Sequence, residues 1–378
     1  MRKRRLLYFV SEDKYFLTHK LPHALIALRN GFRVLVVCKC TTEKKKIFSY
    51  GFEVQDLNLD RKNINPFKEL RNLFKFYKII SNFKPDIIVN VALKPIIFSS
   101  ICSSLFKKRI KLKIHAVVGL GYLFVNKGLK VMILKNLLEK LLFLFINDSK
   151  SITIFQNRDD LNYFLEKKII LNSKQTRLIK SSGVDINYFK PSKTIKKKYD
   201  LIMHSRMLVD KGVLDLINAI KELKKRKIYL KILLLGNPDS KNLASISKNQ
   251  LIAWSKEKII EWQPEKKNIK KYIQSSKIAV LPSYREGFPK SLLEAASCGL
   301  PLISNNVIGC KEICIDGYNG LLVEVNDYLS LSKKIKYLMS NHKLMTKMGK
   351  NSRELVVKNF SEKIISDKFL ELYQIVKI

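Results

Sequence analysis

The sequence predicts an α/β protein made of two doubly wound domains, each with a parallel sheet between layers of helices. The chain has 378 residues, which is more than one hydrophobic core usually serves. Short runs of Val, Ile and Leu alternate with segments of helical length, as in repeated strand–helix units. A basic, loop-like stretch at Lys190–Lys198 separates an earlier series of strands from a later one. Two domains, at 1–190 and 197–358, are therefore expected.

Each predicted strand is a short apolar run that is followed by a segment of helical length. In the first domain we place strands at Leu6–Val10, Arg33–Val37, Asp86–Val91, Ile114–Val118 and Ser151–Gln156. In the second domain we place strands at Asp200–Ser205, Leu230–Leu235, Ile278–Leu281 and Leu302–Ser304, with helices near Gly212–Lys225 and Phe288–Cys298. Continuous apolar runs of this kind are typical of strands buried on both faces of a parallel sheet.

Composition indicates a folded protein and excludes several other classes. Hydrophobic residues make up 46% of the chain and charged residues 28%, which is unlike a disordered protein. The six cysteines show no C-x-x-C spacing, so we expect a reducing, cytoplasmic compartment and no bound zinc. The opening apolar run is too short for a signal peptide, and charged residues interrupt the long apolar stretch Leu129–Ile146. No membrane-spanning segment is predicted.

In doubly wound folds, ligands bind beyond the carboxyl ends of the strands, so the residues at strand ends are the first candidates for a site. The chain has no G-x-G-x-x-G after a strand and no P-loop. The segment His204–Gly212 leaves a predicted strand and enters a helix, and it carries Arg206 and Lys211. A guanidinium and an ammonium at a helix start suit a diphosphate. The alternative is that Arg206 and Lys211 stand at this helix start by chance, because the chain contains 72 Lys and Arg residues.

A second strand end, SYREGFPKSLLEAAS, places two carboxylates eight positions apart. Pro289 suits the first turn of a helix, so Glu286 precedes that helix and Glu294 lies more than one turn inside it. Carboxylates accept hydrogen bonds from hydroxyls, and a helix N-terminus offers free N–H groups to anions. This combination favours a polyhydroxylated anionic ligand. The alternative is that Glu286 only complements the helix dipole and Glu294 is solvated.

These two segments resemble those of glycosyltransferase family 4, which contains retaining enzymes with the GT-B fold of two Rossmann-like domains facing a cleft. Further segments match in order along nearly the whole chain, namely Glu12–Pro22, Gly119–Phe124, Gly183–Asp185 and Asp316–Gly320. Within the family the chain looks most similar to bacterial enzymes that add hexosamines, especially N-acetylgalactosamine, to polyprenyl-diphosphate-linked glycans. The resemblance also implies a C-terminal helix, at 359–378, that returns to the first domain.

The resemblance implies a role for each matching residue of a nucleotide-sugar site. Arg206 and Lys211 would hold the donor diphosphate, together with the amides of Gly287 and Phe288. Glu294 would bind the ribose, and Glu286 would contact the donor sugar as a catalytic residue. The donor is expected to be UDP-linked, and no metal is expected because the chain has no Asp-x-Asp motif. Fixed cations and N–H donors would stabilise the leaving diphosphate instead.

The first domain is expected to bind the acceptor. His115, just before Gly119 and Gly121, lies where relatives can carry an active-site histidine, and we assign it a catalytic role. The alternative for His115 is a histidine packed in a strand. We place His19, Gly119 and Gly121 in the acceptor region, although a histidine early in a helix, such as His19, is more often structural.

The formal charge of +40 raises two further questions about partners. It invites a nucleic-acid-binding interpretation, but the chain shows no nucleic-acid module, so we expect no nucleic-acid partner. A sugar-nucleotide epimerase of similar architecture is the other alternative, and it would need no lipid acceptor. Sugar transfer remains the preferred function.

We expect the enzyme to work at the inner face of the cytoplasmic membrane, as a peripheral protein on an anionic surface. The segment Pro66–Lys78 places Phe67, Leu70, Phe74 and Tyr77 at helical spacing with basic residues between them. The basic residues Lys107, Lys108, Arg109, Lys111 and Lys113 add to this charge. Binding through charge alone should be released by salt and should not occur on neutral vesicles. The alternative is a core-facing helix with a basic outer side.

Overall fold

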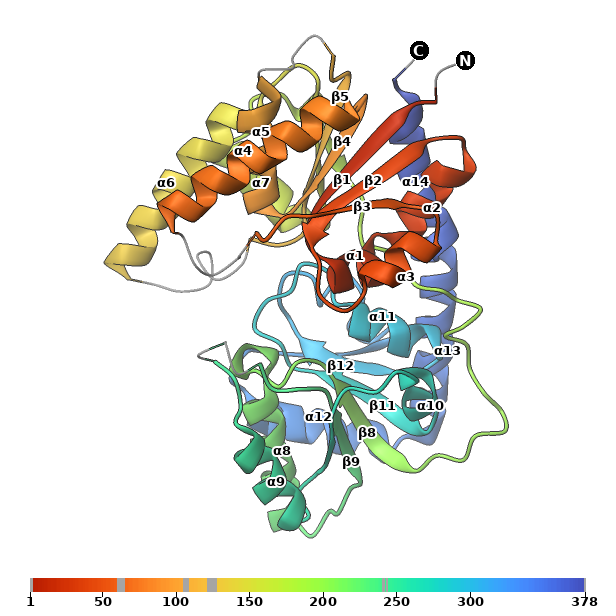
Figure 1. Cartoon of the computed structure of the whole chain (residues 1–378). Coiled ribbons are helices and arrows are strands. Elements are labelled where there is room, and N and C mark those ends of the chain that lie inside the picture. The colour runs from red at the N-terminus through yellow and green to blue at the C-terminus, as the bar shows by residue number, and fades with distance from the viewer. Residues whose placement is uncertain are drawn as a thin grey trace. The chain divides into compact units, whose positions relative to one another are not determined.

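A computed structural model describes residues 3–59, 65–104, 109–120, 128–239, 242 and 244–376. Its contacts divide the chain into two compact units (Figure 1). Unit 1 extends from the N-terminus to Ser182 and includes Lys363 onward, and unit 2 is Gly183–Glu362. The division thus falls before the basic segment 190–198 in which the sequence placed it. That segment belongs to unit 2 because Lys197 Nζ donates to the carbonyls of Gln274 and Ser276.

Unit 1 is built on a parallel sheet of seven described strands in the order β3-β2-β1-β4-β5-β6-β7. The strands are β1 (Arg5–Glu12), β2 (Arg33–Lys39), β3 (Glu53–Asp56), β4 (Ile87–Val91), β5 (Leu112–Val117), β6 (Ser151–Phe155) and β7 (Thr176–Leu178). The central strands are buried throughout because helices cover both faces of the sheet.

The helices of unit 1 form two layers. Apolar side chains of α4 (Pro66–Phe83) and α5 (Leu93–Ser103) pack on one face of the sheet, and α6 (Leu129–Ile146) and α7 (Arg158–Glu166) continue that layer over β5 and β6. The opposite face is covered by α1 (Asp13–His19), α2 (Leu21–Arg29), α3 (Lys44–Ser49) and α14 (Glu362–Gln374). The C-terminal helix α14 therefore packs in unit 1, where the Tyr373 hydroxyl hydrogen-bonds the Tyr8 hydroxyl.

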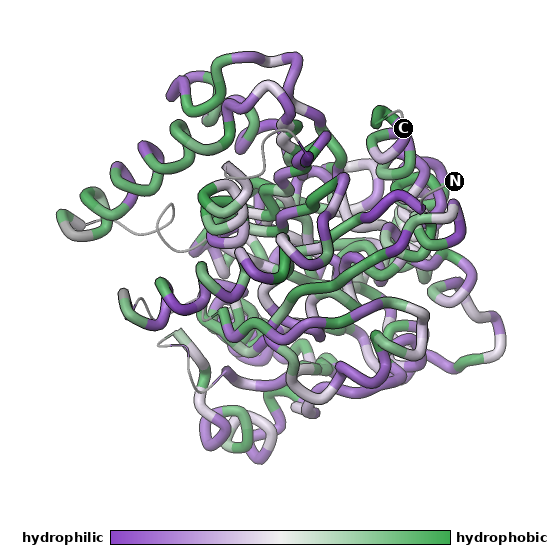
Figure 2. Tube along the Cα trace, turned by 45° about the horizontal axis from the view of Figure 1, so that its top comes forward, coloured by the Kyte–Doolittle hydropathy of each residue, from purple (hydrophilic) through white to green (hydrophobic). Residues whose placement is uncertain are grey.

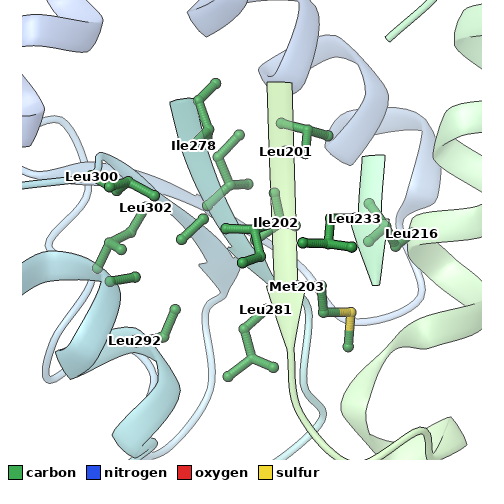
Figure 3. Close-up of a cluster of buried hydrophobic side chains, with 14 of the residues drawn as sticks. Leu201, Ile202, Met203, Leu216, Leu233, Ile278, Leu281, Leu292, Leu300 and Leu302 are labelled. Carbon is green, nitrogen blue, oxygen red and sulfur yellow. The ribbon is translucent and has the colours of Figure 1, made fainter. Parts of the chain in front are cut away.

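Unit 2 repeats the architecture around a parallel sheet with the order β10-β9-β8-β11-β12-β13. Its strands are β8 (Tyr199–His204), β9 (Ile232–Leu235), β10 (Glu261–Gln263), β11 (Ser276–Leu281), β12 (Leu302–Asn305) and β13 (Gly320–Val323). Its helices are α8 (Val213–Lys225), α9 (Lys248–Lys256), α10 (Ile269–Gln274), α11 (Lys290–Ser297), α12 (Tyr328–Met339) and α13 (His342–Asn359). Figure 3 shows the core around β8 and β11, where Leu201, Met203, Ile278 and Leu281 are buried.

The prediction of two doubly wound parallel sheets is confirmed, and the nine predicted strands overlap β1, β2, β4, β5, β6, β8, β9, β11 and β12. The sequence did not reveal β3, β7, β10 and β13. These strands have only three or four residues, and they lie at or next to the sheet edges. Strands β3 and β7 are also partly polar, so they lack the apolar run that marks a central strand.

Candidate functional site

The candidate site lies at the carboxyl ends of β8 and β11 in unit 2. The strand order β9-β8-β11 places β8 and β11 side by side. From β8 the chain continues through α8 to β9 on one side of the pair, and from β11 it continues through α11 to β12 on the other side. This is the topological switch point of the sheet, where doubly wound proteins bind their ligands. The two segments that the sequence singled out, after β8 and after β11, are therefore brought together here.

Lys211 and Glu286 come from these two segments and form an ion pair. Lys211 ends a 3-10 turn (Val209–Lys211), and its Nζ lies 2.6 Å from Glu286 Oε1. The two side chains are only 14% and 15% exposed. An ammonium has three donors, so Lys211 can keep Glu286 and still donate to another anion. The pair thus offers a fixed positive group beside a fixed acceptor.

Glu294 lies in α11, and it faces a residue to which the sequence analysis gave no role. Its Oε2 is 3.2 Å from Nε2 of His204, the last residue of β8. The side chains of His204 and Glu294 are 7% and 14% exposed. Since an ionised carboxylate only accepts hydrogen bonds, the imidazole donates from Nε2 and fixes the orientation of Glu294.

Two glycines allow the loops of the site to approach each other. Gly212 has φ +75°, and a Cβ there would lie 1.9 Å from the carbonyl oxygen of Pro282 at the end of β11. A Cβ on Gly309 would lie 2.5 Å from the carbonyl oxygen of Glu286, whose amide donates to Ile308. Only glycine fits at either position without moving backbone. The Lys211 and Glu286 segments are therefore held by backbone packing as well as by their ion pair.

The expected N–H donors Gly287 and Phe288 lie between Glu286 and α11. The helix begins at Lys290 with Pro289 as its N-cap, so Pro289 stands one residue before the position that the sequence predicted. The Phe288 ring packs on Phe360, with 5.2 Å between centroids, which anchors this end of the loop. Glu286 and Glu294 bracket the start of α11 as the sequence predicted.

Arg206 is the most exposed of the predicted site residues that the structure describes. Its side chain is 60% exposed, and its Nη1 lies 3.4 Å from Asp239 Oδ2 in the loop after β9. The guanidinium thus stands at the edge of the switch point, at the end of β8, where it can turn toward an anion. A salt bridge this exposed holds a side chain only weakly.

His115 is buried inside the sheet of unit 1. It lies in β5, where Nδ1 is 3.2 Å from Asn90 Nδ2 and Nε2 is 3.3 Å from Ser151 Oγ. Burial, helped by the nearby Lys113, lowers its pKa to about 3, so the ring is neutral. This environment agrees with the packed strand histidine that the sequence left as the alternative to a catalytic role.

Of the remaining predicted residues of the acceptor region, the structure describes His19 and Gly119. His19 ends α1, stacks on Tyr15 with 4.2 Å between centroids, and has Nδ1 2.7 Å from Thr18 Oγ1. Gly119 follows β5 with φ +134°. Gly121 lies outside the described residues.

The sequence matches two glycosyltransferase family models. Residues 5–156 match "Glycosyl transferase 4-like", and residues 185–355 match "Glycosyl transferases group 1". Among solved structures, Anabaena HepE in complex with UDP and glucose aligns with a TM-score of 0.80 at 16% identity, over 98% of this chain and 99% of its own. The chain is a glycosyltransferase with the GT-B fold. The two family models together span both units, so the enzyme class is sugar transfer and not epimerisation.

Curated relatives of this glycosyltransferase cover most of its length. N,N'-diacetylbacillosaminyl-diphospho-undecaprenol alpha-1,3-N-acetylgalactosaminyltransferase of Campylobacter jejuni is 27% identical over 356 residues, 90% of each chain. UDP-Gal:alpha-D-GlcNAc-diphosphoundecaprenol alpha-1,3-galactosyltransferase of Escherichia coli is 25% identical over 324 residues, 82% of this chain and 81% of its own.

Two features are absent from the described residues of this glycosyltransferase. No described helix has both the length and the apolar character needed to cross a bilayer. Nor do the described residues contain a group of three or more His, Cys, Asp and Glu side chains placed to hold a metal ion.

Proposed function

We propose that this glycosyltransferase moves a sugar from a nucleoside-diphosphate sugar to a polyprenyl-diphosphate-linked glycan, with retention at the anomeric carbon. A hexosamine such as N-acetylgalactosamine is the proposed sugar, and UDP the proposed carrier. The names of the two relatives, which specify undecaprenol-diphosphate acceptors, support the acceptor class. The observation that carries the proposal is the pairing of Lys211 with Glu286 and of His204 with Glu294 at one switch point.

In this proposal each group of the site has a separate task. Lys211 and Arg206 stabilise the charge that grows on the leaving diphosphate, and the amides of Gly287 and Phe288 donate to sugar or phosphate oxygens. Glu294, held by His204, accepts hydrogen bonds from the ribose hydroxyls. Glu286 contacts the donor sugar while its ion pair with Lys211 holds the carboxylate in place. Because these cations stabilise the leaving diphosphate in place of a metal ion, we propose that EDTA leaves the rate of transfer unchanged.

The acceptor proposal places the enzyme at the inner face of the cytoplasmic membrane. A polyprenyl chain remains in the bilayer, so the glycan must be reached from the surface. The exposed basic residues of α4 support an anionic surface as a partner. Lys113 does not contribute to such a surface because it is nearly buried and pairs with Asp148 at 2.7 Å. Lys107 and Lys108 lie outside the described residues.

A panel of UDP and GDP sugars with a polyprenyl-linked acceptor tests the function. We expect acceptor-dependent release of nucleoside diphosphate from one class of donor, and a large loss in Glu294→Gln. Glu354→Gln is the matched control, because Glu354 lies on α13 of the same unit and is 57% exposed. The proposal fails if no donor is used, or if both variants release nucleoside diphosphate at the wild-type rate at subsaturating donor.

A further inference from the structure

Helix α6 carries large apolar side chains that are exposed along its first half. Leu129, Met132, Ile133 and Leu137 are 69%, 53%, 59% and 55% exposed. Figure 2 colours α6 as hydrophobic over most of its length, including this half. Single exposed leucines are common on protein surfaces, but several on adjoining turns of one helix form a contiguous patch. The patch therefore indicates a partner.

The packing of α6 shows why this half is not part of the core. The buried residues in its second half, Leu142 and Ile146, join the cluster between the sheet, α5 and α7. The residues of the first half that are described are exposed or half-buried. The folding of unit 1 thus explains Leu142 and Ile146, but not the apolar residues of the first half or the exposed Phe143 and Leu144.

Helix α4, in the same layer, exposes a second apolar row. Phe67, Leu70 and Phe74 are 85%, 67% and 59% exposed, whereas Phe76 and Ile80 are buried against the sheet. The core-facing alternative thus holds for the helix and for the partly buried Tyr77, but Phe67, Leu70 and Phe74 face away from the core. Both helices cover the same face of the unit 1 sheet, and both begin at its carboxyl edge, as helices do in strand–helix units (Figure 1).

The charges around these apolar residues are almost all positive. The exposed charged residues of α4 are basic, namely Lys68, Arg71 and Lys75 with Lys78 and Lys84 at its end. Its carboxylate, Glu69, is buried and accepts from Lys94 Nζ at 2.8 Å. The carboxylate of α6, Glu139, accepts from the Tyr163 hydroxyl. On α6, Lys135 pairs with Glu139 at 3.9 Å. The exposed basic residues that accompany the apolar side chains are therefore mainly those of α4.

We propose that α4 and α6 form a membrane-binding surface, in which Phe67, Leu70, Phe74, Leu129, Met132, Ile133 and Leu137 enter the interface of an anionic bilayer. Lysine and arginine stems can lie along this apolar surface while their charges reach the lipid headgroups. The proposal deepens the proposed function, because it rests on an acceptor held in a membrane. It also replaces purely electrostatic binding with binding that has an apolar, salt-resistant component.

Sedimentation with vesicles separates the apolar component from the electrostatic one. The full chain is mixed with phosphatidylcholine vesicles, with or without phosphatidylglycerol, at low and high salt. We expect strong binding to anionic vesicles, partial retention at high salt, and weak but measurable binding to neutral vesicles. Ile133→Ser with Leu137→Ser should weaken partitioning at high salt by at least roughly tenfold, given the apolar area lost.

A control variant removes a large, exposed apolar side chain in the other unit. Tyr229→Ser changes a residue of unit 2 that is 73% exposed, and it should leave vesicle binding unchanged. In Ile133→Trp, the new tryptophan should be quenched by brominated acyl chains, which reports insertion directly. Complete release by salt, no quenching, or wild-type binding of the double variant would overturn the proposal. A change in oligomeric state without a change in vesicle binding would assign the patch to a second copy of the chain.

Sugar transfer to a short-chain, water-soluble acceptor separates the two proposals. The double variant should keep wild-type transfer to that acceptor and lose transfer to a long-chain acceptor in vesicles. If the wild type transfers no sugar to either acceptor, the proposed function fails, while vesicle binding still decides the membrane-binding surface.

Discussion

Replacing Lys20 by methionine should stabilise unit 1 at neutral pH, and the gain should disappear in alkali. Lys20 is 2% exposed, and its Nζ lies 5.3 Å from the centroid of the Phe369 ring. Among the described residues no carboxylate forms an ion pair with it. Burial therefore lowers its pKa from 10.5 to about 8. Methionine has a similar length and carries no charge.

The size and sign of the effect follow from proton linkage. A shift of about 2.5 pH units corresponds to about 3 kcal/mol, and loss of the cation–π contact would offset about 1 kcal/mol. Below pH 8 both folded and unfolded lysine are protonated, so the wild type bears the full penalty. Between about 8 and 10.5 the unfolded chain holds the proton that the folded chain has lost. Wild-type stability therefore rises with pH in this window.

Urea unfolding of the wild type and Lys20→Met, from neutral pH upward, measures this difference. Far-UV circular dichroism reports both units, whereas Trp254 and Trp262, the two tryptophans of the chain, report unit 2. At pH 7 we expect the free energy of unfolding of unit 1 to be about 2 kcal/mol higher in Lys20→Met than in the wild type. This difference should fall by about 1.4 kcal/mol per pH unit above pH 8. Lys45→Met, on the exposed side of α3, should change nothing. A gain that does not depend on pH, or a destabilised variant at pH 7, would refute the reasoning.

Four shorter predictions concern the donor site and the sheet of unit 1. Glu294→Ala should weaken donor binding roughly tenfold to a hundredfold, as expected for lost hydrogen bonds to a charged acceptor. Glu286→Gln should mainly lower kcat. Calorimetry measures the first effect and initial rates measure the second. Arg206→Ala and Lys211→Ala should each weaken binding of every accepted donor, with melting temperatures showing an intact fold; unchanged donor affinity in both would remove them from the site. His204→Phe should weaken donor binding through Glu294, as measured by donor Kd. The pKa of His115 is lowered to about 3 in the folded state. The free energy of unfolding of the wild type should therefore fall by about 1.4 kcal/mol per pH unit as the pH falls from about 6.5 to 3. Unfolding curves of His115→Gln should lack this contribution.

The sequence predicted the fold well because the strands of a doubly wound sheet are buried on both faces. Leu6–Val10 and Ile278–Leu281 are apolar throughout, and both are central strands. Helix α4 shows where such patterns fail. Phe67, Leu70 and Phe74 have helical spacing, but so do Phe76, Ile80 and Phe83, and only the second set is buried. With apolar residues on two sides, periodicity alone cannot decide which side packs on the sheet.

The candidate site was predictable where its residues follow one another along the chain. Glu286 and Glu294 bracket the start of α11 because their spacing of eight and the proline between them fix this arrangement locally. The ion pair of Lys211 with Glu286 could not be deduced, since it joins residues 75 positions apart. It depends on the pairing of β8 with β11 and on the close approach that Gly212 permits.

The role of His204 could not be deduced from the sequence either, and it leads to the sharpest test of the site. A histidine at the end of a strand carries no signal of its own, because its partner Glu294 lies 90 positions away. If His204 acts by orienting that carboxylate, His204→Phe and Glu294→Gln should not be additive. The double variant should bind the donor no more weakly than Glu294→Gln alone, which corresponds to a coupling of about 1 kcal/mol. His204→Gln, which can still donate, should keep most of the donor affinity. Strict additivity would mean that His204 only packs at the end of β8, and that something else fixes the carboxylate.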